Sequence, residues 1–262
     1  MKLPDKELVI FDLDGTLTES KSNLRPDMAR ALAALLARKK VAVIGGGAYH
    51  QFREQFLAEL AVPKPLLANL FLFPTTATTF YRYRGGWRPV YQFLLSKTEV
   101  KAIKKAFADV LKEVRYVPPR KTYGKVLENR GTQVTFSALG QDVVAALGKK
   151  GLRLKEEWKK ENTPLKIKIA KLVQKRLPKF EVRTSAYTSI DVTHKGIDKA
   201  YGVRKIGKTL GVPIKAMVFI GDGLYPGGND HAARRTGVQC IAVRGPEDTK
   251  KIIRNILTLA SH

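Results

Sequence analysis

A short apolar strand that ends in two carboxylates places the tightest constraint on the fold of this chain. Four apolar residues, 8–11, lead directly into Asp12, Leu13 and Asp14, and Gly15 follows. Residues two apart on an extended segment face the same way, so both carboxylates can converge just beyond the strand, where Gly15 lets the chain turn away. Two converging carboxylates favour a bound cation. The sequence therefore predicts a buried strand that leads into a site of chemistry.

A second segment repeats this layout near the end of the chain. The apolar run 216–220 is followed by Gly221, Asp222 and a glycine-rich loop that holds Asp230. Because ligand groups in open α/β sheets gather where parallel strands end, we expect the two sets of carboxylates to share one crevice. Mg²⁺ prefers such oxygen ligands and shares them with water and substrate phosphate, so the sequence predicts magnesium as the cofactor.

Between these two segments the chain changes character twice. The first part alternates strand and helix: a strand at 8–12, a helix at 26–39, a strand at 41–44 that breaks at Gly45-Gly46-Gly47, a helix at 50–60 and a strand at 70–73. From about residue 84 to residue 183 follow lysine-rich helices and a strand-like stretch, 132–137. The alternation then returns, with strands at 216–220 and 240–243 and a closing helix at 246–257.

This order predicts the α/β fold class. We expect a Rossmann-like, doubly wound parallel-sheet core that is interrupted by an inserted α+β cap domain. The expected boundaries are 1–83 for the first core segment, 84–185 for the cap and 186–262 for the second core segment.

Composition excludes some classes and leaves one question open. Hydrophobic residues make up 44% of the 262 residues, which indicates a globular protein. No apolar stretch approaches the roughly 20 residues of a membrane span, and the first residues lack a signal-peptide core, so we expect a cytoplasmic protein without a membrane partner. The 48 Lys and Arg against 23 Asp and Glu give a formal charge of +25, which is typical of a nucleic-acid binder or of a lysine-rich proteome. Solvated helix faces explain most of this charge.

The first motif, Asp12-Leu13-Asp14-Gly15-Thr16-Leu17-Thr18, resembles that of the haloacid dehalogenase superfamily of phosphohydrolases and phosphomutases. The second, Gly221-Asp222 with Pro226-Gly227-Gly228-Asn229-Asp230-His231, and the later run 242–252 look like the eukaryotic phosphomannomutase branch of subfamily IIB. That branch carries an α+β cap of the C2 type. The similarity covers both core segments and, more thinly, the cap.

The resemblance implies roles for the charged residues of the core. Asp12 would be the nucleophile that is phosphorylated, and Asp14 the general acid and base. Lys199 matches the lysine that neutralises the phosphate, and Lys195 is a nearby alternative. The implied metal ligands are Asp12, Asp14 and Asp222. Asp230 and Asn229 would lie behind the ligands, where Asp230 orients Lys199 or a metal-bound water.

Other residues resemble the substrate-binding groups of that branch. Ser189 and Asp191 match a pair that contacts sugar hydroxyls. Arg130 would hold a distal anionic group, although an ordinary salt bridge is the alternative. In place of a Ser or Thr that bonds the transferring phosphate, this chain has glycines, and the N–H groups of Gly46 and Gly47 could form an anion-binding nest.

Two departures from the branch lead us to prefer hydrolysis to isomerisation. The Ser or Thr hydroxyl after strand 41–44 is missing, and among the cap arginines only Arg130 has a clear counterpart. Losing bidentate phosphate clamps should favour water as the acceptor. The first hypothesis is therefore a Mg²⁺-dependent phosphatase of a small phosphorylated metabolite, such as a sugar phosphate. The alternatives are a phosphomannomutase-type hexose phosphomutase and a basic nucleic-acid-binding protein with a vestigial site, while a monomer and a homodimer both remain open.

Overall fold

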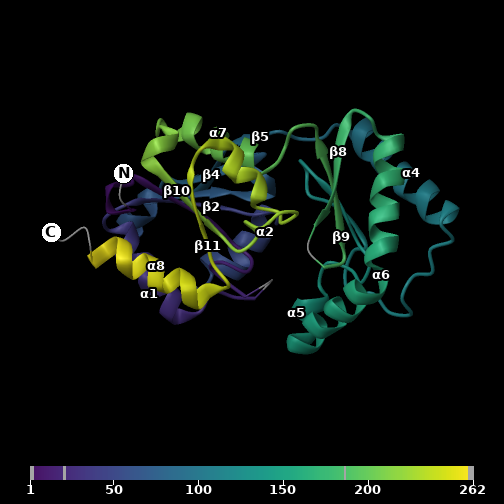
Figure 1. Cartoon of the computed structure of the whole chain (residues 1–262), viewed down its shortest axis with the longest axis horizontal. Helices are drawn as coiled ribbons and strands as arrows, with labels where there is room; N and C mark the ends of the chain where they lie inside the picture. Colours follow the sequence, from purple (N-terminus) through teal and green to yellow (C-terminus); the bar gives the residue numbers. More distant parts are fainter. Residues whose placement is uncertain (1–2, 20–21, 186, 259–262) are drawn as a thin grey trace. The chain divides into compact units, whose positions relative to one another are not determined.

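The computed structural model describes residues 3–19, 22–185 and 187–258. The chain divides into two compact units (Figure 1). The first unit combines residues 1–92 with residues 198–262, and the second consists of residues 93–197. The second unit is therefore an insertion into the sequence of the first.

A seven-stranded sheet forms the centre of the first unit, in the order β11-β10-β1-β2-β3-β4-β5. The five strands from β11 to β3 are parallel, and β4 and β5 continue the sheet as an antiparallel hairpin. The strands are β1 (Leu8–Asp12), β2 (Lys40–Ile44), β3 (Leu70–Phe73), β4 (Thr79–Tyr83), β5 (Trp87–Gln92), β10 (Met217–Gly221) and β11 (Gln239–Ala242).

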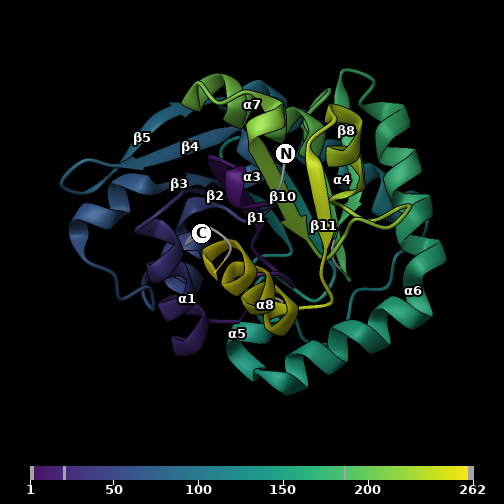
Figure 2. The same cartoon turned by 60° about the vertical axis from the view of Figure 1, so that its left-hand side comes forward.

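Helices cover both faces of this sheet (Figures 1 and 2). The longer ones are α1 (Pro26–Leu36) and α8 (Pro246–Thr258) on one face and α7 (Lys199–Leu210) on the other. Short helices complete the unit: α2 (Tyr49–Phe52), which continues as the π-helical η2 (Arg53–Leu57), α3 (Pro74–Ala77), and the 3₁₀ helices η1 (Leu3–Asp5), η3 (Lys64–Asn69), η4 (Ile214–Ala216) and η5 (His231–Thr236).

The sequence of β1 explains why it is the central strand. Its four apolar residues are fully buried, because a parallel strand between two helical layers has no solvent-facing side. Val9 and Phe11 pack in the core that includes α1 and α8, whereas Leu8 and Ile10 pack in the core that includes α7. The alternation of one strand thus serves two cores, and the chain leaves the sheet at Asp12.

The second unit is an antiparallel sheet with helices packed against it. Its strand order is β6-β7-β9-β8. The strands are β6 (Leu127–Asn129), β7 (Val134–Ser137), β8 (Phe180–Ser185) and β9 (Ser189–His194), and the helices are α4 (Lys97–Glu113), α5 (Val143–Leu147) and α6 (Lys149–Arg176). This unit has a hydrophobic core of its own, to which Phe107, Phe136 and Ile169 contribute.

The predicted fold class is confirmed: a Rossmann-like, doubly wound α/β core carries an inserted α+β cap. The two units meet in sequence at 92/93 and 197/198, whereas composition suggested boundaries at 83/84 and 185/186. The difference arises because β5 pairs with β4 in the first sheet, and β9 pairs with β7 and β8 in the second. In the described part of the chain, no helix has both the length and the hydropathy of a membrane span. The cytoplasmic location stays a prediction.

Candidate active site

The two acidic segments singled out in the sequence lie side by side. Strands β1 and β10 are parallel neighbours, with Phe11 opposite Ile220, so Asp12 and Asp222 follow at the same edge of the sheet. Asp12 is 3% exposed, while Asp222 is half-buried. The juxtaposition predicted from two strand ends is therefore present.

Lys199 brings a buried positive charge to this edge. It is the first residue of α7, whose N-cap Asp198 accepts a hydrogen bond from the backbone N–H of Tyr201 at 2.8 Å. The Lys199 ammonium is ion-paired with Asp12 and lies 2.8 Å from Oδ1 of Asp230. All three side chains are at most 4% exposed. Lys199 thus contacts the predicted nucleophile, and Asp230 holds the lysine from the other side.

Three carboxylates form a group that could hold a metal ion. Asp12, Asp222 and Asp230 each offer an oxygen, and these oxygens all lie within 4.8 Å of one another. The group does not include Asp14, which the sequence placed with the ligands. Strand β1 ends at Asp12, and Asp14 forms an isolated bridge with Thr18 beyond the strand, where its charge still contributes to the raised pKa of Asp222.

The charges of this group explain its titration. Burial, together with the negative charge of Asp230, raises the pKa of Asp222 to about 6. Burial also raises the pKa of Asp12 well above its ordinary value, with Asp230 adding to the shift and Lys199 opposing it. Burial would lower the pKa of Lys199, but Asp12 and Asp230 raise it more strongly, so the ammonium stays charged. Three carboxylates against one ammonium leave a surplus of negative charge, which suits a divalent cation with oxygen ligands.

Two glycines permit the close approach of these carboxylates. A Cβ on Gly15 would lie 2.4 Å from Oδ2 of Asp222, and a Cβ on Gly221 would lie 2.4 Å from Oδ2 of Asp230. Gly15 also has a φ of +83°, which other residues rarely adopt. The glycines beside the acids therefore have a packing role that the motif alone did not reveal.

The glycine loop after β2 is held by a segment that the sequence did not single out. The backbone N–H groups of Thr75 and Thr76 donate to the carbonyls of Gly47 and Gly45, at 2.9 and 2.8 Å. Thr75, Thr76 and Ala77 have φ values of 47°, 57° and 63°, which cost free energy in residues with a Cβ. Gly46 is exposed, and Gly47 is half-buried. The segment Thr75–Ala77, which follows β3, therefore holds the glycine loop by two backbone hydrogen bonds while its own backbone is strained.

In the second unit, Arg130 is engaged within its own unit. Its Nε donates to Glu128 at 2.8 Å, and its Nη2 donates to Oε1 of Gln141 at 2.7 Å. The side chain of Arg130 is only 6% exposed. This is the salt-bridge alternative considered for Arg130. Lys195, the alternative to Lys199, is an exposed residue of this same unit.

Ser189 and Asp191 belong to one polar face of the second sheet. Their neighbours Ile190 and Val192 point into the core, so the alternation places both on the opposite face. Asp191 accepts a hydrogen bond of 2.7 Å from Thr135, and Ser189 lies 3.4 Å from the hydroxyl of Ser137.

Arg183 is a residue that the sequence did not indicate. It is the cross-strand partner of Asp191, on the same polar face of the sheet. Only the pairing of β8 with β9 reveals this, because nothing in the sequence fixes that register.

Asn229, predicted to lie behind the metal ligands, is an exposed residue of the first unit. A Cβ on Gly223 would lie only 2.1 Å from its side-chain oxygen, so the two residues are in close contact.

Comparison with known proteins relates the chain to proteins that are named phosphomannomutases. A family model described as eukaryotic phosphomannomutase matches residues 28–259. A probable phosphomannomutase from Caenorhabditis elegans is 27% identical over 96% of both chains. A phosphomannomutase from Saccharomyces cerevisiae is 24% identical over 96% of this chain and 94% of its own.

Solved structures agree on the fold. A haloacid dehalogenase-like hydrolase from Bacteroides thetaiotaomicron superimposes with a TM-score of 0.62 at 14% identity, covering 96% of this chain and 99% of its own. An IMP-bound IMP-nucleotidase from Plasmodium falciparum gives a TM-score of 0.67 at 14% identity, over 97% of this chain and 68% of its own. At these identities the likeness concerns architecture alone.

Proposed function

Because this chain belongs to the eukaryotic phosphomannomutase family, we propose that it is a Mg²⁺-dependent hexose phosphomutase that interconverts 1- and 6-phosphates. The sequence ranked a phosphatase first, but relatives that match nearly the whole chain are named phosphomannomutases and favour the alternative. The observation that carries the proposal is the cluster of Asp12, Asp222, Asp230 and Lys199, within a chain that matches the family model over residues 28–259.

Asp12 is the proposed nucleophile. Its carboxylate follows the central strand, is nearly inaccessible to solvent, and is paired with the Lys199 ammonium. It would attack phosphorus and become an aspartyl-phosphate. Asp14, half-buried beyond the end of β1, would protonate the leaving alkoxide and later take a proton from the group that accepts the phosphate. In a mutase that group is a hydroxyl of the sugar, whereas in a phosphatase it is water.

Lys199 and the carboxylates would prepare the site for a phosphate dianion. The buried ammonium offsets charge between nucleophile and substrate, and Asp230 keeps it oriented. The oxygens of Asp12 and Asp222 would hold Mg²⁺, which when bound neutralises phosphate charge and polarises the phosphoryl oxygen. Asp14 as a further ligand stays a prediction from the resemblance.

The polar face of the second unit would bind the sugar. Ser189 and Asp191 offer a hydroxyl and a carboxylate, the groups that suit sugar hydroxyls. Arg183, whose guanidinium lies 3.5 Å from Glu181, is the cross-strand partner of Asp191. The N–H groups of the glycine loop would receive the transferring phosphate. The small phosphorylated substrate is then the proposed partner.

A phosphatase is the second candidate, and the state of Arg130 favours it. The guanidinium is already balanced by Glu128 and donates to Gln141, so it has less to offer a second phosphate. A mutase must hold its bisphosphate intermediate while it turns over, and weaker retention would let water react instead. Nucleic-acid binding rests on the charge of +25 alone and stays a prediction.

The test is to supply mannose 1-phosphate and glucose 1-phosphate with a trace of the 1,6-bisphosphate, and to measure 6-phosphate and inorganic phosphate in parallel. A mutase yields 6-phosphate with little inorganic phosphate, in Mg²⁺ and not in EDTA. Dominant release of inorganic phosphate would favour the phosphatase instead. The Asp12→Asn variant should be inactive, and Asp109→Asn, at a half-exposed carboxylate on α4 that pairs with Lys105, serves as the matched control. Absence of both products from the wild-type protein would contradict the proposal.

A further inference from the structure

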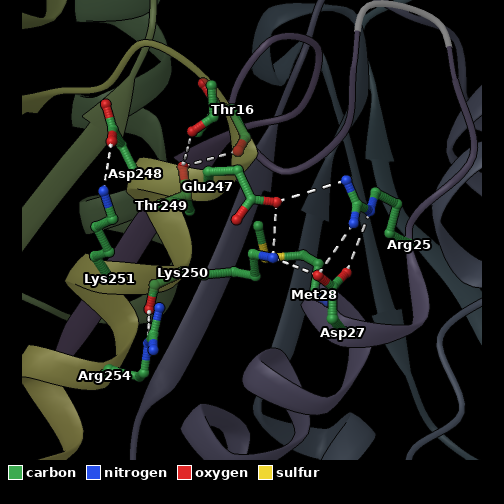
Figure 3. Close-up of polar contacts among 11 residues, drawn as sticks. Thr16, Arg25, Asp27, Met28, Glu247, Asp248, Thr249, Lys250, Lys251 and Arg254 are labelled. Atoms are coloured by element: carbon green, nitrogen blue, oxygen red, sulfur yellow. Dashed lines mark hydrogen bonds and ion pairs between the residues drawn. The ribbon is translucent and has the colours of Figure 1, made fainter.

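A buried hydroxyl in the first turn of α8 has no part in the function proposed above. Thr249 is 0% exposed, and its Oγ1 donates to the carbonyl oxygen of Thr16 at 2.8 Å (Figure 3). The carbonyl of Gly245 lies 3.3 Å from the same hydroxyl. Since a hydroxyl has one proton, the shorter contact indicates that Thr16 receives it. Thr249 therefore bonds from a helix to the loop that follows β1.

Thr16, in turn, holds one of the three clustered carboxylates. The residue is 0% exposed, and its Oγ1 accepts a hydrogen bond of 3.1 Å from the backbone N–H of Asp222. On the same loop, Gly15 packs directly against the Asp222 carboxylate. Thr16 thus fixes the backbone of Asp222 by a hydrogen bond to its side-chain hydroxyl, and Gly15 leaves room for the Asp222 carboxylate.

Ion pairs hold the start of helix α8 against the start of α1. Lys250 is ion-paired with Asp27 of α1 and lies 2.8 Å from Glu247, which lies 3.5 Å from Arg25 (Figure 3). Exposed ion pairs contribute little singly, but Lys250 is 14% exposed and the pairs form a network. The network joins the starts of α1 and α8, so Thr249 is presented from a helix that is anchored on its outer side.

We propose that Thr249 is a positioning residue for the carboxylate cluster. Through Thr16 it keeps Asp222 where its oxygen lies with those of Asp12 and Asp230. This inference rests on the metal site of the proposed function and extends it to a helix that contributes no residue to the cluster. Removing the hydroxyl frees the Thr16 carbonyl, the loop relaxes, and the cluster binds a divalent cation less tightly.

The test measures cation binding directly. Mn²⁺ favours the same oxygen ligands as Mg²⁺, and its free form gives an electron paramagnetic resonance signal, so the dissociation constant follows from a titration. Thr249→Val, which keeps the shape and removes the hydroxyl, should weaken Mn²⁺ binding about tenfold. Thr249→Ser, which keeps the hydroxyl, should stay within about twofold of the wild-type protein. Thr249→Ala is the second hydroxyl-free variant, and the inference is judged on whichever retains the wild-type circular dichroism.

The matched control is Ile253→Val on the same helix. Ile253 is 0% exposed and packs in the same core as Leu17 of the loop, so the variant loses stability through packing while the hydrogen bonds of Thr249 and Thr16 are kept, and its Mn²⁺ affinity should not change. Unchanged binding in the hydroxyl-free variants, or equal weakening in Ile253→Val, would overturn the inference and leave the proposed function standing. Failure of the wild-type protein to bind Mn²⁺ would instead overturn the metal site of the proposed function, and the inference with it.

Discussion

At the scale of single residues, Lys199 is the group on which the site depends most. Its ammonium contacts both Asp12 and Asp230, and its side chain is nearly inaccessible to solvent. A buried ion pair adds little to stability compared with an apolar core, whereas removing one partner leaves an uncompensated charge. Lys199 is therefore expected to matter for both folding and chemistry.

Replacing Lys199 by Met should lower kcat at least about 100-fold, because the phosphate loses a preorganised positive charge. The variant should also lose about 3–5 kcal/mol of unfolding free energy without a divalent cation, since its neighbouring carboxylates are left unpaired. Steady-state kinetics and urea unfolding measure the two effects. Lys195→Met, at an exposed lysine of the second unit, is the matched control and should retain activity. The reverse result would assign the role to Lys195.

The pKa of Asp222, raised to about 6, predicts how the site responds to pH. The pKa of this carboxyl in the unfolded chain is near the ordinary value of 3.8. Between these values the folded protein holds the extra proton, so without a cation its stability falls as the pH rises from about 4 to about 6. Mg²⁺ requires the ionised form, so the increase in Tm that it causes should grow through pH 6 and level off above. A Tm increase that is already full at pH 5 would contradict this.

At the scale of elements, the Thr75–Ala77 segment stores strain beside the glycine loop. Thr76→Gly should raise the unfolding free energy by about 0.5–1 kcal/mol. Relief of the positive φ contributes roughly 1–2 kcal/mol, and the greater conformational entropy of glycine in the unfolded chain cancels part of this gain. Chemical denaturation measures the change. Gly46→Ala, at an exposed residue with no atom within 4 Å of a Cβ, is a control for the neighbouring loop. A less stable Thr76→Gly variant would show that the side chain contributes more than the strain costs.

The sequence predicted best those elements whose burial is uniform. Strands β1 and β3 have the predicted bounds because each is an unbroken apolar run between two helical layers. The hairpin of β4 and β5 was missed, since its strands mix arginine with aromatic residues, and β5 is largely exposed and carries Pro89. Helix α6 extends over 28 residues despite Pro164, because packing of its apolar side outweighs the lost hydrogen bond.

The site was predictable only where strand order decides it. Asp12 and Asp222 could be placed together from the rule that parallel strands end at one edge. Arg183 and Thr249 could not, because a cross-strand register and the docking of a distant helix bring them to their partners. Local sequence patterns do not indicate a role for Arg183 or Thr249. Without the tertiary contacts, each would be predicted to be an ordinary polar surface residue.

At the scale of the whole molecule, the two units have separate hydrophobic cores. Residues 93–197 form one continuous stretch with its own sheet and helices, so this segment expressed alone should fold and unfold cooperatively. Circular dichroism during thermal unfolding checks this. The Phe107→Ala variant of the fragment, which removes a side chain 1% exposed, is the control and should abolish the transition. A broad, non-cooperative loss of signal from the unsubstituted fragment would show that it depends on the rest of the chain.

The position of the insertion also has a consequence for synthesis on the ribosome. Strand β1 is complete at residue 12, yet its neighbour β10 ends only at residue 221. At about 5–20 residues per second, one edge of the central strand waits roughly 10–40 s for its partner. Through that interval the nascent chain exposes unpaired backbone beside buried apolar side chains, the kind of surface that aggregates or recruits chaperones. Lys199 and Asp222 also emerge only after the insertion, so no truncated product that ends within it can carry the complete cluster of Lys199 and the carboxylates.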